Sequence, residues 1–212
     1  LRGAHPAHRR ADRPEPLLEP LMRLRRQPPR RGLTLIELMI VVLVLGVLVA
    51  LVAPSMRGMI SVQRVRGVNA GLVTDLQYAR SEAARRNRDV SVAVQASCYV
   101  VYTDIALPAT ACDCSLTPGV DVCSGGRLEL KTVQLPAADG VSLSVTSGGG
   151  AIVIFSRGSG TLQPTAAGAS PPDAFAVDTS GTPRGKLRTQ LNTAGRPSVC
   201  SPDGSISGTP SC

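Results

Sequence analysis

The sequence predicts an α+β fold in which one long N-terminal helix packs on a β-rich domain of antiparallel strands. An apolar stretch over residues 33–56 continues into residues 57–88, where apolar side chains recur at steps of three and four, the spacing of one helix face. Over residues 89–212, apolar and polar residues alternate in short runs separated by glycine clusters, which is typical of strands joined by turns.

Residues 1–32 differ from the rest of the chain. They hold nine of its 23 Lys and Arg residues, three of its 15 acidic residues and both histidines, His5 and His8. Because they lack apolar periodicity, we expect a leader that is removed, with residues 1–21 an extension ahead of a start at Met22. Without the leader no histidine remains to activate a nucleophile. The sequence therefore predicts a protein that is not an enzyme and holds no cofactor or metal.

The apolar stretch is long enough to cross a membrane. Leu38–Met56 contains 19 residues without a charge, and Leu33–Ile36 extends it to the length of a spanning helix. The arginines ahead of it predict a cytoplasmic N-terminus and an exported C-terminal domain. Because small residues at Ala53-Pro54-Ser55 follow the apolar core, ordinary secretory cleavage there is the alternative.

Glu37 places an acid inside this apolar stretch. A charged side chain at the centre of a membrane helix costs about 2.5–3.5 kcal/mol on insertion scales. An acid in this place therefore predicts a functional site with a partner for its charge. The alternative is that the carboxylate lies at the membrane edge, within reach of the head groups.

The segment Arg30–Leu38 resembles the type III signal of type IV pilins and type II secretion pseudopilins, although Leu33 replaces the usual Phe. The resemblance implies that a prepilin peptidase cuts after Gly32 and methylates the new N-terminus at Leu33. It puts Glu37 at the fifth mature position, and Pro54 where many pilins have a helix-kinking proline. It also implies a chain in the bacterial inner membrane with a periplasmic domain, which then enters a filament with other pilin subunits.

The assembly that this resemblance implies has a physical explanation. The amine of Leu33 is positive, and Glu37 of a neighbouring subunit neutralises it, so both buried charges are compensated only when subunits lie in register.

The segments beyond the membrane stretch predict an amphipathic helix and then strands. The helix is expected to run to about Asn87, with one apolar face for the domain to pack on. Alternation and flanking glycines indicate strands around residues 90–94, 128–131, 141–145 and 152–155. The predicted helix face consists of Val65, Val68, Leu72, Leu76, Ala79 and Ala83.

Two segments narrow the resemblance to the GspH/FimT family of minor pilins and pseudopilins. Residues 75–87 resemble the family's helix end, and residues 154–160 resemble its strand and turn. The implied function is that of a minor type IV pilin that helps to initiate or tip the filament. The alternative is the H-type minor pseudopilin of a type II secretion system. An enzyme ranks lower, because Gly158-Ser159-Gly160 has no histidine to serve it.

Four cations near the C-terminus form a candidate DNA-binding site. Arg184, Lys186 and Arg188 would share one face of a strand, and Arg196 follows them. Such a strip would bind phosphate without sequence preference. Some FimT-like minor pilins bind DNA through a Gly-Arg-x-Arg element, and the matching Gly195-Arg196-Pro197-Ser198 lacks the second Arg. A solvated strand edge blunted by charge is the alternative.

The six cysteines predict disulfides, because the exported domain would meet an oxidising compartment. We expect Cys200 and Cys212 to close the C-terminal tail. Cys98 is expected to pair with one of Cys112, Cys114 and Cys123, a choice that the sequence leaves open. A thiolate metal site on these four is the alternative.

Overall fold

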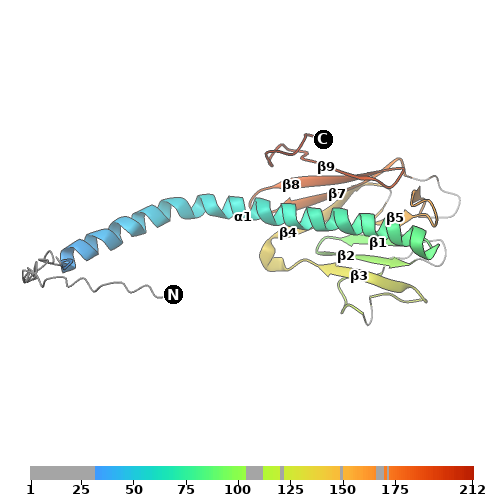
Figure 1. Ribbon diagram of the computed structural model, residues 1–212, viewed down its shortest axis with the longest axis horizontal. Helices are drawn as coiled ribbons and strands as arrows, with labels where there is room; N and C mark the ends of the chain where they lie inside the picture. Colours follow the sequence, from blue (N-terminus) through green and yellow to red (C-terminus); the bar gives the residue numbers. More distant parts are fainter. Residues whose placement is uncertain (1–31, 104–111, 120–121, 149, 166–169, 171) are drawn as a thin grey trace, which may run out of the picture. The chain divides into compact units, whose positions relative to one another are not determined.

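The structure is a computed structural model that describes residues 32–103, 112–119, 122–148, 150–165, 170 and 172–212, without the side chains of residues 52–55. The expectations for the leader and for a start at Met22 lie outside the described residues. The described chain forms one helix and two antiparallel sheets (Figure 1). Their bounds are α1 (Leu35–Arg86), β1 (Val90–Gln95), β2 (Cys98–Thr103), β3 (Leu128–Gln134), the 3₁₀ turn η1 (Ala137–Asp139), β4 (Val141–Ser147), β5 (Ile152–Phe155), β6 (Leu162–Gln163), β7 (Ala174–Gly181), β8 (Lys186–Asn192) and β9 (Pro197–Cys200).

The strands divide into two sheets of different size. The first has the order β3-β2-β1-β5-β6 and the second has the order β4-β7-β8-β9, and every neighbouring pair is antiparallel. This arrangement confirms the predicted α+β class. The structure also contains β2, β7 and the short strands β6 and β9, which the alternation of the sequence did not single out.

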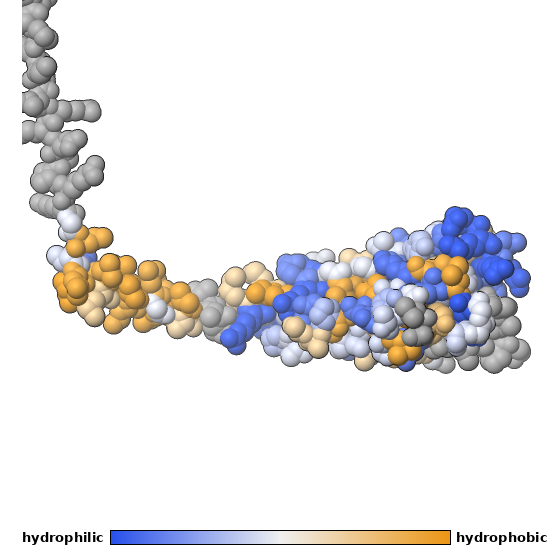
Figure 2. Space-filling model, turned by 90° about the horizontal axis from the view of Figure 1, so that it is seen from below, coloured by the Kyte–Doolittle hydropathy of each residue, from blue (hydrophilic) through white to orange (hydrophobic). Residues whose placement is uncertain are grey.

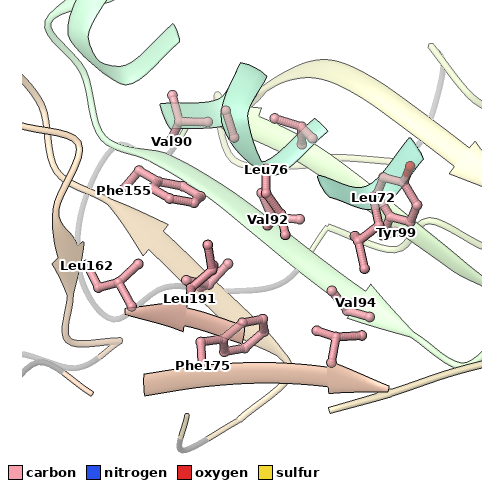
Figure 3. Packing of buried hydrophobic residues seen from close by; sticks show 14 of the residues in the cluster. Leu72, Leu76, Val90, Val92, Val94, Tyr99, Phe155, Leu162, Phe175 and Leu191 are labelled. Carbon is pink, nitrogen blue, oxygen red and sulfur yellow. The ribbon is translucent and has the colours of Figure 1, made fainter. Parts of the chain in front are cut away.

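The second half of α1 packs on the sheets through the predicted face. Val65, Leu72, Leu76 and other members of that face are buried, whereas Val68 is only partly buried. Leu72 and Leu76 meet the large side chains of the strands, and Figure 3 shows this packing. Val65 packs in a separate cluster with Leu187 and Ile206. The helix ends at Arg86, and the next residue, Asn87, has a left-handed φ of 49°, a conformation that ends helices and that Asn tolerates.

Polar contacts interrupt this apolar packing along α1, and we call them the polar seam. Asn69 Nδ2 donates to Thr189 Oγ1 at 2.7 Å and to Thr179 Oγ1 at 3.3 Å. Further along the helix, Asp75 accepts from Tyr99 at 2.7 Å and from Lys131 at 2.6 Å. Burial raises the pKa of the Tyr99 hydroxyl, and its hydrogen bond to Asp75 raises it further, so the proton stays on the tyrosine. A buried polar group is tolerated where it is hydrogen-bonded, as here.

The outer face of the first sheet is covered by the cysteine-rich segment. Cys98 is joined to Cys114, and Cys112 is joined to Cys123, so the partner of Cys98 that the sequence left open is Cys114. These cystines pack with Val100 and other residues of a second buried cluster. Both faces of β1 and β2 are therefore buried, which explains why β2 lacks a clear alternation. Cys200 and Cys212 close the C-terminal tail.

Candidate functional site

The start of α1 brings together the residues predicted for processing and assembly. Gly32 and Leu33 are exposed and precede the first helical residue. The Glu37 amide donates to Thr34 Oγ1 at 3.3 Å, and the Leu38 amide donates to the Thr34 carbonyl at 3.2 Å. Thr34 thus caps the helix, and Thr34-x-x-Glu37 has the spacing of a capping box. The spacing of Thr34 and Glu37 in the sequence is the signal that could have revealed this role of Thr34, which was not predicted above.

The first half of α1 presents apolar side chains to its surroundings. Its large apolar residues from Leu33 to Leu51 are all exposed, with Leu35 at 79% and Leu51 at 72%. Hydrophobic surface gathers along this half of the helix (Figure 2). Among the described residues, no single helix is long and apolar enough to cross a membrane. The segments Leu35–Leu51 and Met56–Arg86, joined at a bend, together meet the requirement by length and composition.

The four predicted DNA-binding cations do not form one free strip. Lys186 and Arg188 lie on β8, and both contact Asp178 of the neighbouring strand β7. Arg188 Nε lies 2.6 Å from Asp178 Oδ1, and Lys186 Nζ lies 2.9 Å from Asp178 Oδ2. The sequence indicated solvent or a bound anion for this face, and the structure supplies a carboxylate from the chain itself.

Asp178 is fully buried beneath these two cations. Burial alone would raise the pKa of its carboxyl, but the hydrogen bonds and positive charges of Arg188 and Lys186 outweigh burial, so the pKa lies below its ordinary value. The same contact raises the pKa of Arg188. The three groups together carry a single positive charge at neutral pH. This face therefore attracts phosphate less than the sequence alone indicated.

The other two cations lie beyond the two ends of β8. Arg184 precedes the strand, and Arg196 lies in the turn to β9, and both are exposed. Gly195 has a φ of 70°, and a Cβ there would collide with the carbonyl oxygen of Gly160. The glycine of Gly195-Arg196 is thus required by the backbone of this turn, whatever the arginine binds.

Ser159 lies in an exposed turn with other hydroxyl groups. Its Oγ is 3.1 Å from Ser156 Oγ and 3.0 Å from Thr161 Oγ1. The described residues include no histidine, and no group of His, Cys, Asp or Glu in the described ranges is arranged to hold a metal. The six cysteines are all joined in disulfides.

Comparison with protein families gives two matches that together cover most of the chain. The model of the family described as type II transport protein GspH matches residues 70–198, more than half of the chain. A second model, the prokaryotic N-terminal methylation motif, matches residues 28–53 and so includes Gly32, Leu33 and Glu37. The search of curated proteins gave no match.

Two solved structures resemble the fold. Both are crystal forms of the type IV minor pilin FimU from Pseudomonas aeruginosa, with TM-scores of 0.46 and 0.41. Each is 17% identical to this chain and covers 65% of it, and the matches span 88% and 90% of the FimU chains.

Proposed function

This chain belongs to the GspH family of pilin-like proteins, and from this premise we propose that it is a minor pilin that helps to initiate or tip a type IV pilus. The main support for this proposal is that the methylation motif leads directly into the long helix α1. The first half of this helix is exposed and apolar, and one face of its second half is buried against the domain. Such a chain has an assembly helix and a separate surface for recognition. The family and its fold are structural rather than enzymatic.

The proposal assigns a task to each part of the chain. Residues 1–32 are a leader that prepilin peptidase removes after Gly32, and Leu33 becomes the N-methylated N-terminus. Residues 33–56 anchor the chain in the bacterial inner membrane as a single span with a cytoplasmic N-terminus, and then pack in the filament. Residues 57–88 support the periplasmic domain of residues 89–212, whose three disulfides fit an oxidising compartment.

The second candidate is the H-type minor pseudopilin of a type II secretion system, which the description of the matching family favours. Deleting the gene separates the two. We expect loss of surface pili with normal protein secretion. Loss of secretion with normal pili would contradict the minor-pilin proposal and support the H-type minor pseudopilin instead.

Processing after Gly32 is tested by replacing Gly32 with valine. A Cβ at Gly32 meets nothing within 4 Å, so the change does not disturb the described fold. We expect the wild-type chain to begin with N-methylated Leu33 and the variant to keep its leader, as read by mass spectrometry of membrane extracts. Gly46→Val is the matched control, because Gly46 is equally open. A processed Gly32→Val chain, or a wild-type chain beginning after Ala53, would refute the assignment.

We do not extend the proposal to DNA capture. Lys186 and Arg188 share the carboxylate of Asp178, which leaves one net positive charge, and Arg184 and Arg196 lie at opposite ends of β8. We expect the full chain in detergent to retain little DNA near physiological salt, and Arg184→Gln with Arg196→Gln to change retention less than about twofold. This pair leaves Asp178 and its partners intact. Salt-sensitive retention that disappears in the double variant would restore DNA binding as a function.

A further inference from the structure

A groove of about 580 Å³ opens between three elements of the domain. One wall is α1, which contributes Met59, Val62 and Arg66. The turn between β7 and β8 contributes Arg184, and the disulfide-closed tail contributes Ser207. The groove therefore combines apolar side chains with two cations from elements distant in sequence.

A hydrogen bond of its guanidinium holds Arg66 in place, and a hydrogen bond to its carbonyl holds the turn that carries Arg184. Arg66 Nη2 donates to the Ser207 carbonyl at 2.7 Å, which fixes its guanidinium against the tail. Ser61 Oγ donates to the Arg184 carbonyl at 2.6 Å, which holds the turn against the helix. Within the described ranges, neither guanidinium forms an ion pair with a carboxylate. The groove thus presents two uncompensated positive charges, and the guanidinium group suits paired hydrogen bonds to phosphate.

The surface next to the groove is apolar on one side. Met56, Met59 and Ile60 of α1 are 49%, 63% and 47% exposed, and they continue the exposed apolar half of the helix. No acidic residue occurs in the sequence between Glu37 and Asp75. An occupant of the groove therefore meets positive charge in the groove and apolar side chains along the helix, which fits an amphiphile with an anionic head.

Aromatic side chains argue against nucleic acid as the occupant. Single-stranded nucleic acids bind proteins largely by stacking bases on exposed aromatic rings. The chain has three Tyr, two Phe and no Trp. Tyr99, Tyr102, Phe155 and Phe175 are buried in the core, and Tyr78 is partly buried against it. In the described part of the chain no aromatic residue lines the groove, so a nucleotide whose phosphate bound there would have no ring on which to stack its base.

One end of the groove lies at the depth of lipid head groups if the apolar stretch spans the membrane. At a rise of 1.5 Å per residue, Met59, Val62 and Arg66 lie about 5, 9 and 15 Å beyond Met56, the last residue before Arg57. Side chains on a helix tilt back toward its N-terminus, so the long side chain of Arg66 extends toward the membrane end of the groove. The head-group layer extends roughly 5 to 7 Å from the hydrocarbon edge on each side. Arg184 lines the groove together with Met59 and Val62, and its carbonyl accepts a hydrogen bond from Ser61 of the same stretch of helix.

We infer that this groove binds the phosphate of an anionic phospholipid head group while the chain is anchored in the membrane. The lipid's acyl chains lie along the apolar side chains of α1, and Arg66 and Arg184 hold its phosphate. The inference rests on the proposed membrane anchorage, because a chain without that anchorage would not meet lipid at this place. The groove then holds the periplasmic domain at the membrane surface before assembly.

Native mass spectrometry of the full chain in a non-ionic detergent tests this site. We expect the wild-type chain to retain phosphatidylglycerol in preference to phosphatidylcholine. Arg66→Gln with Arg184→Gln should lower this retention by about tenfold, since both charged contacts to phosphate are lost. Arg88→Gln with Arg196→Gln is the matched control, because it removes the same charge from exposed arginines outside the groove. The control should retain lipid like the wild type.

Competitors identify the source of the phosphate. Glycerol phosphate and a DNA oligonucleotide should not displace the lipid, because neither offers acyl chains to the helix. Equal retention by the groove variant, or displacement by either competitor, would overturn the inference. Flotation of the same chain with vesicles reports anchorage separately. A chain that floats without selecting phosphatidylglycerol refutes only the groove, whereas one that does not float refutes the proposed anchorage as well.

Discussion

Replacing Glu37 with alanine is expected to leave membrane insertion and cleavage intact and to abolish incorporation into filaments. In the proposed assembly, the carboxylate of Glu37 neutralises the amine of Leu33 on a neighbouring subunit. Without it the amine would be buried in the filament core without a counter-charge, and removing one partner of a buried ion pair is strongly destabilising. Membrane insertion should be unaffected, because alanine has a lower free energy of insertion than glutamate in an apolar helix. We expect sheared filaments to contain no detectable variant chain.

Control variants separate the charge of Glu37 from its position at the helix start. Glu37→Gln keeps the size of the side chain and should fail like alanine. Thr34→Ala removes the hydroxyl that accepts from the Glu37 amide, at a cost of about 1 kcal/mol of helix capping, and keeps the charge. We expect Thr34→Ala to enter filaments within about twofold of the wild type. Normal incorporation of Glu37→Gln, or equal failure of Thr34→Ala, would show that capping rather than charge is required.

Replacing Asp178 with alanine is expected to destabilise the domain by about 2 kcal/mol. Breaking a fully buried pair costs about 3–5 kcal/mol, and the estimate here is lower because solvent screens the partners. The side chain of Arg188 is 27% exposed and that of Lys186 is 37% exposed, whereas Asp178 is fully buried. The measurement is denaturant unfolding of the full chain in detergent, followed by tyrosine fluorescence.

A matched control removes an acid from an exposed ion pair. Asp139 and Arg64 are separated by 3.6 Å, with side chains 40% and 44% exposed. Asp139→Ala should change the free energy of unfolding by less than about 1 kcal/mol. Adding Arg188→Ala to Asp178→Ala should recover part of the loss, since it removes an unpaired cation. Equal effects of the two aspartate variants would contradict the buried role of Asp178.

Because the pKa of Asp178 is lowered in the folded state, the stabilisation that this contact gives depends on pH. A carboxyl whose pKa is lower in the folded state stabilises the fold above its unfolded pKa of about 3.9, and this contribution is lost as the pH falls through the folded value. The difference in stability between the wild type and Asp178→Ala should therefore be constant near neutral pH and shrink in acid below about pH 4.

The residues proposed for processing and assembly are predictions that the sequence alone supports, because their signals are local. Gly32, Leu33 and Glu37 stand in one short motif, and the face of α1 follows from helical spacing alone. The role of Asp178 could not be predicted, because it depends on the pairing of β7 with β8, which sets Asp178 opposite Arg188. Strand β2 lacked a pattern because the cysteine-rich segment buries its second face. Both features depend on contacts between elements that are distant in the sequence, and local patterns do not reveal such contacts.

The polar seam has a mechanical consequence for a subunit in a filament under tension. The apolar face of α1 repeats with each turn. If α1 slipped by one turn, about 5.4 Å, along the sheets, similar apolar side chains would therefore occupy the same places against the strands. Asn69 cannot slip in this way, because Thr179 and Thr189 are its partners at a single position. Asp75 is fixed likewise by Tyr99 and Lys131. A force along α1 acts on all of these hydrogen bonds at the same time. The polar seam therefore resists sliding of the two sheets along the helix.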